Sequence, residues 1–242
     1  MSYLVDSYHG ETVAAAPVSE RVAFIRRTYA HVLGAILAFV GLSAGLIASG
    51  LAEQIIRDIF LANRMSWLVM MVVFIGGTFA AQYMARSRSS VGMQYAGLAL
   101  YVMLYTLLFL PILTIASDPK YGIGNPQLPI QAGIVTLTVF GGLTAAVFVS
   151  GKDFSFLGPV LMVGSFLALG VILAAVIFGF SLGLVFSAVM VALFAGFIIY
   201  DTSNIIHRYG TNEHVAASMA LFGSVAMLFY YILRIFMSAR SD

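Results

Sequence analysis

The sequence contains no cysteine among its 242 residues. This absence excludes disulfide bonds, thiolate metal centres and every catalytic mechanism that uses a cysteine nucleophile. Charge is also scarce, because Asp, Glu, Lys and Arg make up 9% of the chain, against about 25% in soluble domains. No long basic cluster and no glycine-rich phosphate loop is found, which argues against nucleic-acid and nucleotide binding.

Hydrophobic residues, in contrast, make up 61% of the chain and gather in long runs. A run of about 20 apolar residues is long enough to cross a bilayer as a helix. The sequence therefore predicts an all-α polytopic membrane protein with about seven transmembrane helices. The predicted spans are 25–49, 65–85, 93–115, 130–150, 156–178, 181–202 and 216–237.

The region before the first span is polar and includes Asp6, Glu11 and Glu20. It lacks the apolar core of a cleavable signal peptide, so we expect the first span to stay in the membrane. We predict a mobile cytoplasmic tail over residues 1–22 and a seven-helix transmembrane domain over residues 23–242.

The distribution of Lys and Arg predicts the orientation, because cytoplasmic loops carry more of both. With seven spans, the side of the N-terminus collects seven of the twelve: Arg21, Arg26, Arg27, Arg86, Arg88, Lys152 and Arg208. The opposite side collects Arg57, Arg64, Lys120, Arg234 and Arg240. The bias favours a cytoplasmic N-terminus, with loop 116–129 outside and loop 203–215 inside.

Asp201 stands out because no other Asp or Glu lies well inside a long apolar run. A carboxylate in or at the edge of a span is costly, so it usually faces a bundle interior or a water path. Asn204 follows at i+3 and Arg208 at i+7, which predicts a short polar stripe on one helix face. The alternative is that Asp201 reaches headgroup water and only ends the span.

Metal binding and catalysis find little support. Of the four histidines, only His207 is near Asp201, at a spacing that suits one helix face poorly. Weak cation coordination by Asp201, Asn204 and backbone carbonyls fits better, because hard cations take oxygen ligands. A hydrolase scheme using Ser224 with His207 or His214 lacks a nucleophile motif. We predict no enzymatic activity and no cofactor.

Three patches together resemble the Bax inhibitor-1 (TMBIM) family, and most closely its bacterial YccA-like branch. The first is KDFSFL at residues 152–157, and the second is YDTSNIIH at residues 200–207, with Thr211-Asn212 after it. The third is LRIF at residues 233–236. Their order and spacing match the family over about the last hundred residues.

The resemblance implies a seven-helix bundle whose last helix is central and surrounded by the other six. It also implies a pH-sensitive calcium leak, in which two aspartates on the sixth and seventh spans share protons. Asp201 matches the first aspartate, and an arginine at the end of the second span, Arg86 or else Arg88, matches its counter-ion. Ser224 stands where the second aspartate is expected, so the two-aspartate sensor is incomplete in this chain.

The leading functional hypothesis is a low-flux leak for calcium or another cation, gated near Asp201. The expected partners are the lipid bilayer and Ca²⁺ or protons. The alternative is a non-transporting modulator or substrate of a membrane AAA+ protease of the FtsH type, acting through the tail at residues 1–22. The expected location is the bacterial inner membrane, as a multi-pass protein with a cytoplasmic N-terminus.

Overall fold

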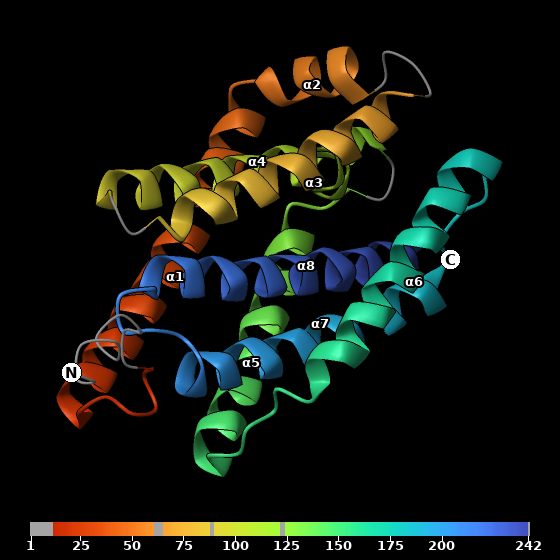
Figure 1. The fold of residues 1–242 in the computed structure, drawn as a ribbon. Helices are drawn as coiled ribbons and strands as arrows, with labels where there is room; N and C mark the ends of the chain where they lie inside the picture. The colour runs from red at the N-terminus through yellow and green to blue at the C-terminus, as the bar shows by residue number, and fades with distance from the viewer. Residues whose placement is uncertain (1–11, 61–64, 88–89, 122–123, 242) are drawn as a thin grey trace, which may run out of the picture.

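Seven long apolar helices form the protein in a computed structural model, which describes residues 12–60, 65–87, 90–121 and 124–241 (Figure 1). Each is long and apolar enough to cross a membrane, which confirms the predicted polytopic all-α fold. They are α1 (Val18–Ala48), α3 (Ser66–Ala85), α4 (Val91–Ser117), α5 (Gln127–Ser150), α6 (Leu157–Phe178), α7 (Leu184–His207) and α8 (His214–Ser241). The short α2 (Leu51–Ile55) and a π-helical turn (Ile56–Phe60) follow α1.

The last helix, α8, lies in the middle of the bundle (Figure 1). It packs against α1, α3, α4, α5 and α7, whereas α6 packs mainly against α7 at the edge. The last helix is therefore central, as expected, but five long helices surround it and α6 packs on α7 instead. Small residues allow the close packing of α8. At Gly223, a Cβ would collide with the hydroxyls of Tyr101 and Tyr105, so both tyrosine side chains would have to move to admit one.

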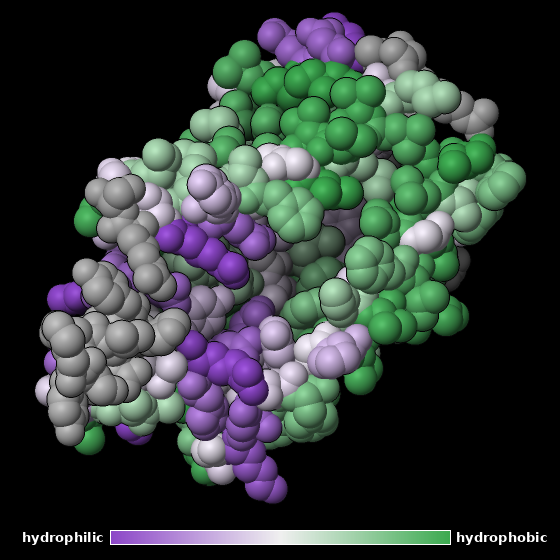
Figure 2. All heavy atoms as spheres, viewed as in Figure 1, coloured by the Kyte–Doolittle hydropathy of each residue, from purple (hydrophilic) through white to green (hydrophobic). Residues whose placement is uncertain are grey.

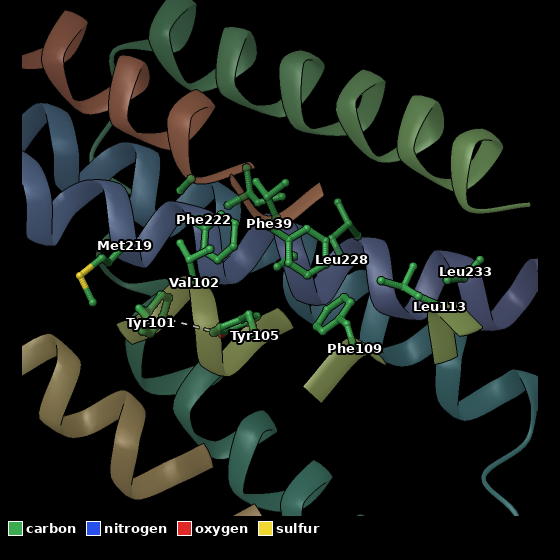
Figure 3. Close-up of a cluster of buried hydrophobic side chains, with 14 of the residues drawn as sticks. Phe39, Tyr101, Val102, Tyr105, Phe109, Leu113, Met219, Phe222, Leu228 and Leu233 are labelled. Carbon is green, nitrogen blue, oxygen red and sulfur yellow. Dashed lines mark hydrogen bonds between the residues drawn. The ribbon is translucent and has the colours of Figure 1, made fainter. Parts of the chain in front are cut away.

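Aromatic side chains fill the core between α8 and its neighbours (Figure 3). Phe109 of α4 is fully buried and stacks on Phe229 of α8, with ring centroids 6.1 Å apart. The Tyr101 and Tyr105 hydroxyls lie 3.3 Å apart and share a hydrogen bond, which satisfies two polar groups inside the apolar core. The core thus fixes α4 against the central helix.

The residues before α1 pack against the loop between α7 and α8. The Val13 N–H donates to the Tyr209 carbonyl at 2.9 Å, and the Val13 side chain is fully buried. Arg21 donates to the carbonyls of Val13 and Ala14 at 3.2 and 2.9 Å. The structure therefore differs from the predicted tail over residues 1–22: residues 12–17 are docked and α1 begins at Val18. Residues 1–11 lie outside the described part.

Hydrophilic residues gather at two ends of the molecule, with an apolar surface between them (Figure 2). One end carries α2, and the opposite end carries the start of α1 and the loop between α7 and α8 (Figure 1). An apolar band between two polar ends is what a bilayer requires, because hydrocarbon cannot solvate charge. The polar loops of the chain therefore lie on the two sides of the membrane.

Candidate functional site

Asp201 is buried between α7 and the central helix. Asp201 is a residue of α7, which continues to His207, and it is 8% exposed. The Ser224 hydroxyl of α8 donates to Oδ2 of Asp201 at 2.5 Å. The same hydroxyl lies 3.3 Å from the Ala220 carbonyl one turn earlier. The structure thus brings Asp201 and Ser224 into direct contact, and Asp201 is not a headgroup-exposed helix end.

The expected counter-ion is not in contact with Asp201. Arg86 is exposed and follows the last residue of α3, whereas Asp201 faces inward to α8. Among the described residues, the ion pairs are Lys120–Glu53, Lys120–Asp118 and Arg208–Asp153, so none involves Asp201. The partner of Asp201 in this structure is therefore a neutral hydroxyl. Arg88, the alternative counter-ion, lies outside the described residues.

Tyr209 lies in the loop after α7, and the charges of Asp201 and Arg86 both shift the pKa of its hydroxyl. Burial raises the pKa of the Tyr209 hydroxyl well above its ordinary value. The Asp201 carboxylate raises that pKa further and the Arg86 guanidinium lowers it. Tyr209 therefore stays protonated at physiological pH, and its backbone carbonyl also holds Val13. Tyr209 therefore binds the docked N-terminal residues through its carbonyl, and its hydroxyl responds to the charge of Asp201.

Several buried oxygens near Asp201 have no hydrogen-bond partner among the described residues. They are Oδ1 of Asn204 and the hydroxyls of Thr202, Tyr29 and Thr144. The Tyr29 hydroxyl of α1 lies next to Thr202 of α7 and Thr144 of α5, without hydrogen-bond geometry to either. A buried oxygen without a partner costs about 1–3 kcal/mol. Sequence reasoning identified Asn204 but missed the three hydroxyls, because they come from three helices.

Arg208 does not belong to the Asp201 stripe that the helical spacing predicted. Its guanidinium donates to Oδ2 of Asp153 at 3.4 Å and to the Ser155 hydroxyl at 2.7 Å. The Ser203 hydroxyl accepts from the Phe154 N–H at 2.8 Å. Two of the sequence patches, 152–157 and 200–207, therefore meet in an inter-loop clasp, which we define as Asp153, Phe154, Ser155, Ser203 and Arg208.

The clasp stabilises the ionised form of Asp153. The Ser155 N–H donates to this carboxylate at 2.9 Å and lowers its pKa most. The Ser155 hydroxyl and the Arg208 guanidinium lower the pKa of Asp153 further, and burial opposes them. A depressed folded pKa stabilises the protein above the unfolded value of about 3.9, and this contribution is lost as pH falls through the folded value. Asp153 therefore stays ionised around neutral pH, and the hydrogen bonds of the clasp do not change there.

We predict that Asp153→Asn opens this clasp and speeds hydrogen exchange in residues 151–156 and 203–209. The neutral amide cannot pair with Arg208, and it weakens the turn at Ser155. The difference from the wild-type protein should be equal at about pH 6 and pH 8, because Asp153 is ionised at both. Lys152→Gln is the control, since Lys152 is exposed and outside the clasp. A difference that disappears at pH 6 would contradict the assignment.

Of the histidines that the structure describes, His31 and His214 pack together, and His207 has a separate partner. His31 bonds to Tyr95 at 2.9 Å and packs against the ring of His214, while His207 bonds to the Ser203 carbonyl. Among the described residues, no group of three His or acidic side chains is placed to hold a metal ion. The Ser224 hydroxyl bonds to Asp201 and not to a histidine, so the structure places no histidine base on it.

Comparison with known proteins decides the family. The family model described as inhibitor of apoptosis-promoting Bax1 matches residues 21–241. The chain belongs to the Bax inhibitor-1 family. The match includes Asp201, Ser224 and both halves of the clasp, so the candidate site lies within the part that this family shares.

Relatives in the Bax inhibitor-1 family come from distant organisms. Mouse protein lifeguard 4 is 29% identical over 230 residues, or 95% of this chain and 90% of the relative. The Golgi anti-apoptotic protein of vaccinia virus (strain Lister) is 30% identical over 236 residues, or 95% and 91%. The BI1-like protein of Arabidopsis thaliana is 36% identical over 140 residues, a match that covers about half of each protein. The seven-helix chain is thus matched over almost its full length by two of these relatives.

Proposed function

We propose that this chain is a pH-sensitive leak for Ca²⁺ or another cation, with Asp201 as the residue that both the cation and the proton bind. One observation carries the proposal. The Asp201 carboxylate is buried beside the central helix and bonds to a neutral hydroxyl, and it forms no ion pair with an arginine in the described part of the chain. A carboxylate kept inside a membrane bundle is costly and typically belongs to an ion or proton path.

The oxygens around Asp201 support a cation as the ligand. Hard cations such as Ca²⁺ take carboxylate, amide and hydroxyl oxygens. Asn204, one turn after Asp201, offers a buried Oδ1 without a partner among the described residues, whereas the Thr202 hydroxyl lies beside Tyr29. With Asp201, Asn204 therefore offers oxygen ligands on one face of α7. A passing cation would therefore replace hydration oxygens with protein oxygens in this region.

The contact between Asp201 and Ser224 links protonation to helix packing. An ionised carboxylate only accepts hydrogen bonds, whereas a protonated one also donates. Ser224 now donates to Asp201, so a proton on the carboxylate changes the hydrogen bonding between α7 and α8. Because α8 packs against five other long helices, a change at this contact reaches most of the bundle.

The test is cation flux into liposomes that contain the purified protein and a fluorescent Ca²⁺ indicator. Protons and cations compete for the same carboxylate, so flux should increase from about pH 5 to about pH 8. Protein-free liposomes and liposomes with the heat-denatured protein are the controls. Flux that equals the protein-free leak across this pH range would overturn the proposal.

We also propose that the chain belongs to the YccA-like branch, because Ser224 replaces the second aspartate of the sensor. The proposed location is the bacterial inner membrane, with the N-terminus in the cytoplasm. Under this topology the Lys120 loop faces outward, and the clasp and the docked residues 12–17 face the cytoplasm.

The topology predicts opposite labelling of two introduced cysteines, which is a clean measurement because the chain has none of its own. Lys120 and Lys152 are both exposed, and they precede α5 and α6 respectively. A membrane-impermeant maleimide should label Lys120→Cys in intact spheroplasts and Lys152→Cys only after permeabilisation. The reverse pattern would invert the proposed orientation.

A second proposal, modulation of a membrane protease of the FtsH type, depends on the residues before α1. Part of that segment is docked, because Val13 is fully buried and its N–H bonds to the loop after α7. A protease that grips the N-terminus must therefore bind residues before Thr12 or first detach residues 12–17. Deleting residues 1–11 should abolish degradation in this case and leave flux unchanged.

A further inference from the structure

A groove runs between α1 and α5, from the level of Phe222 on α8 toward the α2 side of the bundle. It encloses about 580 Å³, and its floor includes Phe39 of α1 and Phe222 of α8, whose rings pack 6.2 Å apart (Figure 3). Along α1 it is lined from Ile36 to Ala48, and along α5 from Pro129 to Leu137, with Pro126 just before the helix. We call this cavity the α1–α5 groove.

The α1–α5 groove opens sideways to the bilayer. Val40 of α1 is 53% exposed, and Ile130 and Ile134 of α5 are each 62% exposed, although all three are apolar. Such exposure within spans means contact with hydrocarbon. The groove therefore has lipid-facing edges and a floor made by the central helix.

Its length matches one leaflet of the membrane. The stretch of α1 from Ile36 to Ala48 rises about 18 Å at about 1.5 Å per residue. Half of the hydrocarbon core of a bilayer is about 15 Å thick. Ala48 is the last residue of α1, and Pro126 immediately precedes α5. The groove thus begins where two helices reach the interface and ends near the middle of the membrane.

The hydroxyls in the lining of the α1–α5 groove are not available to a ligand. The Ser43 residue is 4% exposed, and its hydroxyl is enclosed by protein atoms, without a hydrogen-bond partner in the described part of the chain. The other two hydroxyls of the lining, those of Ser117 and Thr136, donate to carbonyls of their own helices at 2.7 Å. A ligand for this groove should therefore be apolar along its whole length.

We propose that the α1–α5 groove binds one acyl chain of a phospholipid from the leaflet on the α2 side. A single hydrocarbon chain is narrow, apolar and present at high concentration beside the open edges. The inference is independent of the cation leak.

The test uses phosphatidylcholine with a photoreactive diazirine in one acyl chain, mixed into nanodiscs that contain the whole protein. After irradiation, labelled peptides are mapped by mass spectrometry. Peptides covering residues 36–48 and 126–137 should be labelled, and this labelling should saturate as the probe is increased. Labelling of α6, whose Phe166 and Leu167 are each 67% exposed, reports the surrounding lipid and should increase without saturation.

Gly133→Phe is the variant that fills the α1–α5 groove. Gly133 lines the groove, and a Cβ placed there meets no atom within 4 Å. The matched control is Gly141→Phe, on the same helix, with equally open space and outside the groove lining. Gly133→Phe should lower groove labelling about tenfold, and Gly141→Phe should leave it unchanged. Labelling of α6 should be equal in all three proteins.

Ser43→Ala is a second control, because it changes the lining without filling the groove and is small enough to preserve the fold. It should leave groove labelling unchanged, because the Ser43 hydroxyl is enclosed by protein atoms. Equal, non-saturating labelling of the groove and α6, unaffected by Gly133→Phe, would mean surrounding lipid only and would overturn the proposal. Crosslinks from the groove to a second copy of the chain would identify a dimer interface and would overturn it as well.

Discussion

Replacing Asp201 with asparagine is expected to lower cation flux in liposomes about tenfold, which corresponds to a barrier increase of about 1.4 kcal/mol. Asparagine has nearly the same shape and still offers an oxygen to the Ser224 hydroxyl, so the packing of α7 on α8 should be retained. It has no charge to attract a cation and no proton to exchange. The pH dependence of the remaining flux should therefore disappear along with most of its magnitude.

The same variant should be more stable than the wild-type protein at about pH 8, by about 1–3 kcal/mol. Asp201 is 8% exposed and makes one hydrogen bond to a side chain, with no ion pair among the described residues. A neutral group in its place removes the cost of burying an ionised carboxylate. Thermal unfolding in detergent, followed by the fluorescence of the single tryptophan, measures this change.

The control for Asp201→Asn is Asp153→Asn, which makes the same chemical change at an exposed carboxylate of the clasp. Asp153→Asn should retain flux and should not raise stability. Loss of flux in both variants would mean that any loosening of this end of the bundle stops transport. Retained flux in Asp201→Asn would mean that Asp201 has only a structural role.

Ser224→Asp should give flux a steeper pH dependence than the wild-type protein has. The Ser224 hydroxyl lies 2.5 Å from Oδ2 of Asp201, so an aspartate at 224 brings a second carboxylate close to the first. Two carboxylates this close share a proton, because both cannot readily be ionised together. The shared proton would join α7 to α8 in acid, and its loss at higher pH would separate them by charge repulsion.

Ser224→Asn is the matched control, since it has the shape of aspartate without the second ionisable group. Its flux should follow the same single titration as the wild-type protein, whereas Ser224→Asp should change over a narrower pH interval. The measurement is Ca²⁺ flux into liposomes at closely spaced pH values for all three proteins. Identical profiles for Ser224→Asp and Ser224→Asn would show that residue 224 takes no part in the pH response.

The sequence by itself determined the seven spans. In a chain with so few charges, apolar runs of bilayer length are stable as membrane-spanning helices. It also identified Asp201 as the buried carboxylate, since charge within such a run is rare. Position 224 was matched to Asp201 through the family resemblance, and the observed contact agrees with that match. These features depend on composition along one segment or on a pattern of neighbouring residues.

Only the tertiary structure decided which side chains are partners. Helical spacing placed Arg208 with Asp201, but the loop before α6 brings Asp153 to Arg208 instead. The polarity of residues 1–22 predicted a tail, but the side chain of Val13 is fully buried between segments that are distant in the chain. The hydroxyls near Asp201 and the α1–α5 groove come from helices far apart in the chain. Such contacts depend on how helices cross, and the local periodicity of a sequence does not contain that information.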